Sequence, residues 1–296
     1  MATDIASYDN FNLSYKNSSL SLIPSLGCNI TSLILDGQSV LDTNTDPKLL
    51  LEDFLCKSDF LAPFPNRISD GKYEFQGKVY QLEKNETARG HAIHGLIIKK
   101  EFKKIKEVLS ELSSKVIFLT KIKPDEFQGY PFHLQIEISF ELFEKKLVIN
   151  VIAINIGEND APYGVGWHPY LKVGKKVDYC QFTIPAKSIL EVDTIKELIP
   201  TGNMLANDFG VNKKEINETT FDTCFTDLGS NSVLFENIEL FMDKSMKFVQ
   251  VYTPDNRESI AVEPMSCAPD AFNNQMGIIT LKPGSRVGHE FGIRIV

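Results

Sequence analysis

Two of the five histidines in this sequence stand in surroundings that suit proton transfer. The segment GVGWHPY, residues 164–170, places two glycines, the only tryptophan and a proline around His168. Aromatic faces pack on the apolar faces of a pyranose ring while polar groups hold its hydroxyls, so this density is typical of a sugar pocket. His94 precedes Gly95, whose missing side chain would let a ligand approach closely. His133 and His289 lie in strand-like segments, and we expect structural roles for both.

Glu263 is the carboxylate most suited to act with these histidines. It follows an apolar run and directly precedes Pro264. We therefore expect it at the end of a strand, where the chain turns and where catalytic side chains often lie. A solvated strand-end glutamate would show the same pattern, so Glu263 is a candidate only together with the histidines.

The elements that must position these residues are predicted to be strands. Residues 134–142 alternate between apolar and polar, residues 144–146 mark a turn, and a new strand begins at 147, which predicts a hairpin. The same alternation fits residues 72–82, 232–242, 247–252 and 259–262. Residues 103–112 carry apolar side chains at helical spacing between strand-like runs, and their conformation stays open. The pattern predicts an all-β protein, a large antiparallel β-sandwich with few short helices, in one domain over residues 1–296.

Composition restricts the classes of partner. The chain has 31 Lys and Arg against 39 Asp and Glu, a formal net charge of −8, which argues against nucleic acid. No apolar run approaches the roughly 20 residues of a membrane span, and the acidic N-terminal residues do not resemble a signal peptide. The five cysteines are scattered without a CxxC pair, so neither a disulfide framework nor a zinc knuckle is expected. We expect a cytoplasmic protein with a small neutral ligand; the sequence leaves its oligomeric state open.

Taken in order, ten short segments resemble the aldose 1-epimerase (galactose mutarotase) family over most of the chain. They are PNRI (65–68), GKYEFQG (71–77), Leu82 with Asn85, HG (94–95), GYP (129–131), WHPY (167–170), FDTCF (221–225), QVYT (250–253), VEP (262–264) and LKPG (281–284). The sequence departs from the family pattern at three places. Leu96 replaces a frequent second glycine, Glu86 replaces a frequent second asparagine, and Thr223-Cys224 replaces a frequent pair that contains histidine. These departures bear on sugar preference more than on the chemistry.

The resemblance implies an enzyme that interconverts the α and β anomers of a free aldose such as galactose or glucose, on a mutarotase-like sandwich. It implies Glu263 as the proton acceptor and His168 as the proton donor, and whether His94 shares the donor role stays open. Ring opening of a hemiacetal requires one base and one acid, and it needs neither a metal nor a cofactor. The implied substrate-holding residues are Asn66, Arg67, His94, Asp222 and Gln250.

Three other functions fit part of the pattern. A metal hydrolase would use His91 and His94 with His168 and Glu263, but in an extended chain His91 and His94 project to opposite faces. A glycoside hydrolase would pair Glu263 with Asp222 and leave His168 without a role. A non-catalytic carbohydrate-binding protein would need neither an acid nor a base.

A hexose-6-phosphate 1-epimerase is the alternative that shares most with the favoured function. Binding a phosphate in a partly dry pocket needs several cationic donors, and the matching motifs bring only Arg67 to the site. Four other basic residues lie near the motifs in sequence, and we expect them on the solvated surface: Arg89, Lys99, Lys100 and Lys172.

Overall fold

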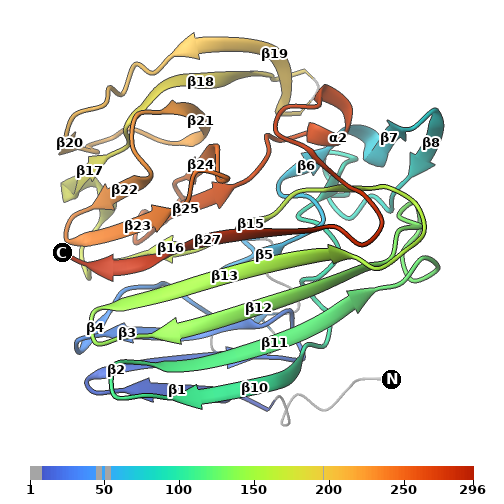
Figure 1. Cartoon of the computed structure of the whole chain (residues 1–296). Coiled ribbons are helices and arrows are strands. Elements are labelled where there is room, and N and C mark those ends of the chain that lie inside the picture. The colour runs from blue at the N-terminus through green and yellow to red at the C-terminus, as the bar shows by residue number, and fades with distance from the viewer. Residues whose placement is uncertain (1–8, 45–48, 51–54, 196) are drawn as a thin grey trace.

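The computed structural model describes residues 9–44, 49–50, 55–195 and 197–296, and antiparallel strands form nearly all of the regular secondary structure in this part of the chain (Figure 1). Among these described residues, helical structure is limited to short segments, such as α2 (Ala271–Asn274) and the 3-10 turns η2 (Ser69–Gly71) and η3 (Val177–Tyr179). The predicted all-β class is confirmed. No helix among the described residues is long and apolar enough to span a membrane.

Two large sheets carry the architecture. The nine-stranded sheet has the order β10 (Lys103–Leu109), β11 (Ser114–Ile122), β12 (Leu134–Leu142), β13 (Lys146–Asn155), β27 (Arg286–Ile295), β23 (Ile238–Met242), β22 (Ser232–Phe235), β17 (Gln181–Thr183), β20 (Lys214–Glu215). The eight-stranded sheet has the order β19 (Ile199–Ala206), β18 (Ala186–Asp193), β21 (Asp222–Leu228), β24 (Phe248–Tyr252), β25 (Ile260–Met265), β15 (Gly166–Trp167), β5 (Phe60–Leu61), with β16 (Tyr170–Leu171) also paired to β25.

Smaller sheets complete the fold. A four-stranded sheet of β1 (Phe11–Tyr15), β2 (Ser18–Ile23), β3 (Asn29–Leu35) and β4 (Gln38–Ser39) packs on β11 and β12. Three two-stranded pairs are β6 (Arg67–Ile68) with β9 (Ala92–Ile93), β7 (Lys72–Phe75) with β8 (Lys78–Gln81), and β14 (Ala161–Tyr163) with β26 (Ile279–Leu281). The pair β6–β9 carries one wall of the candidate site described below.

The alternating pattern of residues 134–142 coincides with β12, whose five apolar side chains are fully buried. β12 and β13 form the predicted hairpin, with Leu142 opposite Leu147. Two other alternating stretches contain hairpins of their own: residues 72–82 form β7 and β8, and residues 232–242 form β22 and β23. Gln76 and Gly77 both have positive φ, 50° and 74°, as the tight turn between two twisted strands requires.

The ambiguous stretch at residues 103–112 contains the edge strand β10. All seven of its residues are exposed, and it pairs with β11 through a bulge between Lys104 and Lys106. A strand with both faces in water has no buried face to enforce alternation, which explains why Ile105, Val108 and Leu109 give a helix-like spacing.

The core lies between the nine-stranded sheet and a second layer, which the eight-stranded and four-stranded sheets form. Its aromatic side chains link both layers: Phe60 meets Phe140 edge-on at 5.7 Å between ring centroids, and Trp167 stacks between Phe60 and Phe291 at 6.1 and 5.9 Å. This packing fixes β15 and β5 against the nine-stranded sheet and thereby holds the segment that carries His168.

Candidate active site

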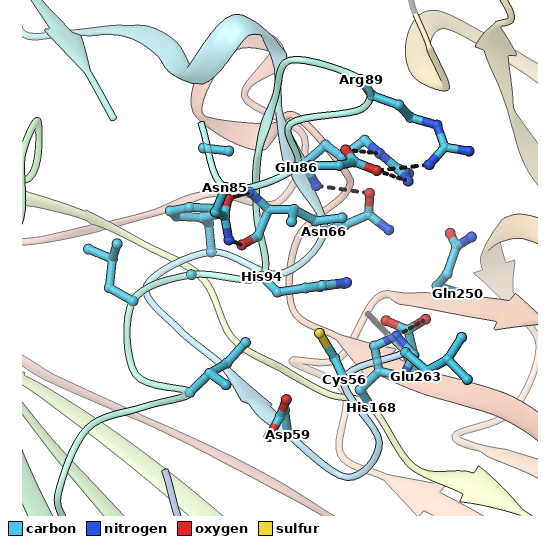
Figure 2. Close-up of a pocket in the computed structure, with 18 of the residues that line it drawn as sticks. Cys56, Asp59, Asn66, Asn85, Glu86, Arg89, His94, His168, Gln250 and Glu263 are labelled. Carbon is cyan, nitrogen blue, oxygen red and sulfur yellow. Dashed lines mark hydrogen bonds and ion pairs between the residues drawn. The ribbon is translucent and has the colours of Figure 1, made fainter. Parts of the chain in front are cut away.

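One cavity, of about 1070 Å³, collects the candidate residues of the sequence analysis. Strands β21, β24 and β25 supply one wall, and the segments around β6 and β9 supply the opposite wall (Figure 2). All seven predicted site residues line it: Asn66, Arg67, His94, His168, Asp222, Gln250 and Glu263. Six of them are buried, whereas Asp222 is exposed at the cavity rim.

The acid and base candidates are in direct contact. His168 Nε2 lies 3.3 Å from Glu263 Oε1, and the two side chains are only 7% and 2% exposed. Glu263 Oε2 and His168 Nδ1 have no hydrogen-bond partner among the described residues. Buried polar atoms are normally satisfied, so a ligand with hydroxyl groups would restore hydrogen bonds that this pair lacks.

Glu263 lies inside β25 and not at a strand end, so that prediction is wrong. The strand continues through Pro264 to Met265, and Gln250 of β24 stands opposite Glu263. On the side of β25 away from β24, the Val262 N–H donates to the Pro169 carbonyl. Backbone N–H groups two residues apart in a strand point to the same side, so the nitrogen of Pro264 faces that side as well. There β15 and β16 are interrupted, and the missing N–H of proline breaks no ladder hydrogen bond.

His168 occupies that interruption between β15 and β16. Its N–H donates to the Asp59 carbonyl at 3.0 Å, and its own carbonyl accepts from the Ser58 N–H at 2.8 Å. Its ring stacks on Tyr170, 5.2 Å between centroids with the planes 9° apart. Backbone and ring contacts together fix the imidazole against Glu263 before any ligand binds.

The opposite wall presents His94 and Asn66. His94 has φ of 63° and donates its N–H to the Asn66 carbonyl at 2.9 Å. Its ring meets the His168 ring edge-on at 5.1 Å, and in Figure 2 it points across the cavity toward Gln250 and Glu263. Gly95 lines the cavity, and its missing side chain also serves packing. A Cβ there would lie 2.3 Å from the Ala62 carbonyl oxygen, so this glycine allows two chain segments to pack.

Asp222 and Gln250 form a polar pair on the sheet wall. Gln250 Nε2 donates to Asp222 Oδ1 at 2.8 Å, and Gln250 stands opposite Glu263 across the β24–β25 ladder. The remaining amide oxygen of Gln250 and the remaining carboxylate oxygen of Asp222 can accept hydrogen bonds from hydroxyl groups.

Arg67 belongs to a charged cluster at the rim. Its Nε and Nη2 donate to the two carboxylate oxygens of Glu86 at 2.8 and 2.9 Å. Arg89 Nη1 donates to the same carboxylate at 3.0 Å, and Arg89 Nε lies 3.5 Å from Glu197. Arg89 is exposed, as expected, but its pairing with Glu86 also places it at the cavity, and the exposed Lys99 lines the cavity too.

Burial shifts the titration of the central groups in opposite directions. It raises the pKa of Glu263 well above its usual range, with a further rise from Asp222 and a partial reduction from Arg67. Burial also lowers the pKa of His168 to about 3, and burial, His168 and Arg67 together lower the pKa of His94 well below its usual range. Both shifts favour the neutral forms of the two side chains in the free protein, a protonated Glu263 carboxyl and a neutral His168 imidazole.

Trp167 and His91, two further residues considered in the sequence analysis, lie outside the cavity lining. Trp167 does not line the cavity as a sugar platform: it is fully buried, and its Nε1 donates to the Ser58 carbonyl at 3.2 Å. The aromatic lining comes instead from Phe64, Phe127, Tyr170 and Tyr252.

His91 is not among the residues lining the cavity, and its Nδ1 accepts from the Asp70 N–H at 3.1 Å. Across the described ranges, no three His, Cys, Asp or Glu side chains are arranged to hold a metal ion.

Comparison with known proteins identifies relatives. The sequence profile of the aldose 1-epimerase family matches residues 10–294. The uncharacterized protein YihR of Escherichia coli (strain K12) is 34% identical over 236 residues, which cover 76% of this chain and 74% of that protein. Human galactose mutarotase is 29% identical over 191 residues, which cover 62% of this chain and 53% of the human protein.

A solved structure supports the fold. The galactose mutarotase-like protein of Clostridium acetobutylicum superimposes with a TM-score of 0.85 and 20% identity, over 99% of this chain and 97% of that one. At this identity the likeness shows the galactose mutarotase-like fold and nothing further. The family match over nearly the whole sequence carries the assignment: this chain belongs to the aldose 1-epimerase family.

Proposed function

We propose that this protein is an aldose 1-epimerase that interconverts the α and β anomers of a free, unphosphorylated aldose. The observation that carries the proposal is the contact of 3.3 Å between His168 Nε2 and Glu263 Oε1 at a cavity lined by groups that bind hydroxyls. Anomer exchange needs one base at the C1 hydroxyl and one acid at the ring oxygen. Both oxygens are bonded to C1, so the base and the acid must lie close together.

In the proposed mechanism, Glu263 takes the proton from the C1 hydroxyl while His168 gives a proton to the ring oxygen. The bond between C1 and the ring oxygen breaks, and its electron pair stays on the ring oxygen. Rotation about C1–C2 exposes the other face of the aldehyde. The same two side chains then return the protons in the reverse sense and close the ring, so neither is consumed.

The charged form needed for ring opening differs from the neutral form favoured in the free protein. A sugar hydroxyl that donates to Glu263 and a ring oxygen that accepts from His168 both stabilise the carboxylate–imidazolium form. Arg67 acts in the same direction, because its charge lowers the pKa of Glu263. Ring opening moves a proton onto Glu263 and removes one from His168, which leaves both side chains neutral. The pair holds one proton before and after this step, so ring closure can reverse it.

The groups around this pair suit a ring with several hydroxyls. Asn66, His94 and Gln250 offer neutral donors and acceptors, Arg67 offers donors, and Asp222 accepts at the rim. Asn66, Arg67, His94 and Gln250 are buried, which makes each of their hydrogen bonds with the sugar stronger than it would be in water. A purely binding protein would need this lining but would gain nothing from a buried acid beside a buried base.

The charge of the cavity favours an unphosphorylated sugar over a hexose 6-phosphate. Arg67 and Arg89 already share the carboxylate of Glu86, and Asp222 and Glu263 add further carboxyl groups. Lys99 is exposed at the rim, where water screens its charge. A phosphate dianion would therefore meet little uncompensated positive charge.

The experiment is polarimetry on freshly dissolved α-galactose, α-glucose and α-glucose 6-phosphate. The proposal predicts faster mutarotation of a free aldose than of the phosphorylated sugar, compared as kcat/KM. A clear preference for the 6-phosphate would replace the proposal with a hexose-6-phosphate 1-epimerase. Sugar binding without acceleration of mutarotation would replace it with a non-catalytic carbohydrate-binding protein.

A further inference from the structure

The rim cluster of Arg67, Glu86 and Arg89 has the geometry of an occupied anion site. Two guanidinium groups converge on one carboxylate, with three N–O distances between 2.8 and 3.0 Å. The Arg67 and Glu86 side chains are only 10% and 12% exposed. Guanidinium pairs of this kind bind the oxyanions of ligands when no internal carboxylate is present.

Glu86 is held in this place by its own loop. Its N–H donates to the His91 carbonyl at 3.0 Å, and the preceding Asn85 side chain bonds both the N–H and the carbonyl of Ile93. Burial by itself would raise the pKa of Glu86, but the hydrogen bonds and charges of Arg67 and Arg89 outweigh burial and hold that pKa below its usual range. The carboxylate therefore stays ionised at neutral pH and stays paired.

We propose that Glu86 fills the oxyanion site formed by Arg67 and Arg89 and thereby makes the cavity select uncharged sugars. This inference rests on the proposed function, because it names the substrate class of the same cavity. The carboxylate occupies two of the five N–H donors of Arg67 and leaves the others for hydroxyl groups. It also cancels charge that would otherwise attract a sugar phosphate or a sugar carboxylate. Glu86 acts through Arg67 and is thus a positioning and specificity-determining residue.

The test replaces the carboxylate by an amide of the same shape, Glu86→Gln. Isothermal titration measures the affinities for glucose and glucose 6-phosphate without requiring turnover. We expect the affinity for the phosphate, relative to glucose, to rise by about tenfold or more, the size of one charge-assisted hydrogen bond. Where the variant is active on glucose, KM rises more than kcat falls, because Arg67 loses its fixed orientation.

The matched control is Glu197→Gln. It removes one negative charge from the same cluster, since Glu197 lies 3.5 Å from Arg89, but it leaves both Arg67 hydrogen bonds to Glu86 in place. We expect it to change the affinity ratio by less than about twofold, as for a screened surface pair. Glu86→Asn, which also removes the carboxylate and shortens the side chain, should shift the ratio in the same direction as Glu86→Gln.

Several outcomes would overturn the proposal. An unchanged ratio in both Glu86 variants, or an equal change in Glu197→Gln, would show that pairing with Arg67 does not set selectivity. Failure of both Glu86 variants to fold, judged by circular dichroism, would make Glu86 a requirement of the fold instead. If the wild-type protein binds glucose without accelerating its mutarotation, the proposed function fails, while the shift in the affinity ratio still supports the role of Glu86.

Discussion

Glu263 is an ionisable group in a place that disfavours its charge, so Glu263→Gln is expected to stabilise the folded protein. The side chain is 2% exposed, and burial, followed by Asp222, raises its pKa well above the usual range. The unfolded chain has the ordinary carboxyl pKa, so a rise in pH favours the unfolded state, which releases the proton first. The amide of glutamine can donate to His168 Nε2 as the protonated carboxyl does.

The size of the effect follows from the linkage between proton binding and folding. Above about pH 4.5, the wild-type protein loses about 1.4 kcal/mol of stability per pH unit through this group, until the pKa of the folded state is reached. Glutamine does not titrate, so the stability difference between variant and wild type grows at the same rate. For a chain of 296 residues this corresponds to about 2 °C in Tm per pH unit.

The assay is differential scanning calorimetry of both proteins at intervals between about pH 5 and 8. The control is Glu218→Gln, which makes the same substitution at an exposed position, so that any pH dependence shared by the two variants is not due to burial. A constant difference for Glu263→Gln, or one that shrinks as pH rises, would refute the reasoning. It would mean that Glu263 is already ionised in the free protein.

Three other changes have defined outcomes. Burial lowers the pKa of His289 to about 4, so the folded protein loses up to roughly 3 kcal/mol of stability as pH falls from about 6.5 to 4. His289→Gln should reduce the difference between the free energies of unfolding measured in urea at pH 7 and 4.5, and an unchanged difference would contradict this. Gly95→Ala places a Cβ 2.3 Å from the Ala62 carbonyl oxygen at φ of 73°, and should lower the free energy of unfolding by about 2 kcal/mol or more. An unchanged Tm would show that the backbone shifts to accommodate the methyl group. Gln250→Ala removes the hydrogen bond to Asp222 and should raise KM by about tenfold with a smaller fall in kcat, and a loss confined to kcat would count against a binding role.

The strands with one buried face were predictable from the sequence, and the edge strand was not. Leu134 to Leu142 alternate because every second side chain enters the core, so the hydrophobic pattern records the burial directly. β10 has no buried face, and its pattern contains no such record. Glu263 was placed wrongly because Pro264 is normally a sign of a strand end, and the break between β15 and β16 that admits it lies about 95 residues earlier in the sequence.

The residues of the candidate site were predictable as a set, but their partners were not. The motifs pointed to the seven residues that line one cavity, whereas ion pairing depends on distances that the sequence does not contain. Glu86 was visible only as a departure from the family pattern, and Arg89 only as a nearby basic residue. Trp167 gave a false signal, because large aromatic side chains are as common in cores as in sugar pockets.

The central claim is that His168 and Glu263 act as one acid–base unit on the anomeric centre. The measurement is the kcat/KM for mutarotation of freshly dissolved α-glucose by the wild type, Glu263→Gln, His168→Asn and the double variant, each shown to be folded by circular dichroism. We predict that each single change lowers kcat/KM by about 10²-fold or more, and that the double change costs little beyond the more severe single one. Wild-type activity in either single variant, or losses that multiply in the double variant, would contradict the claim.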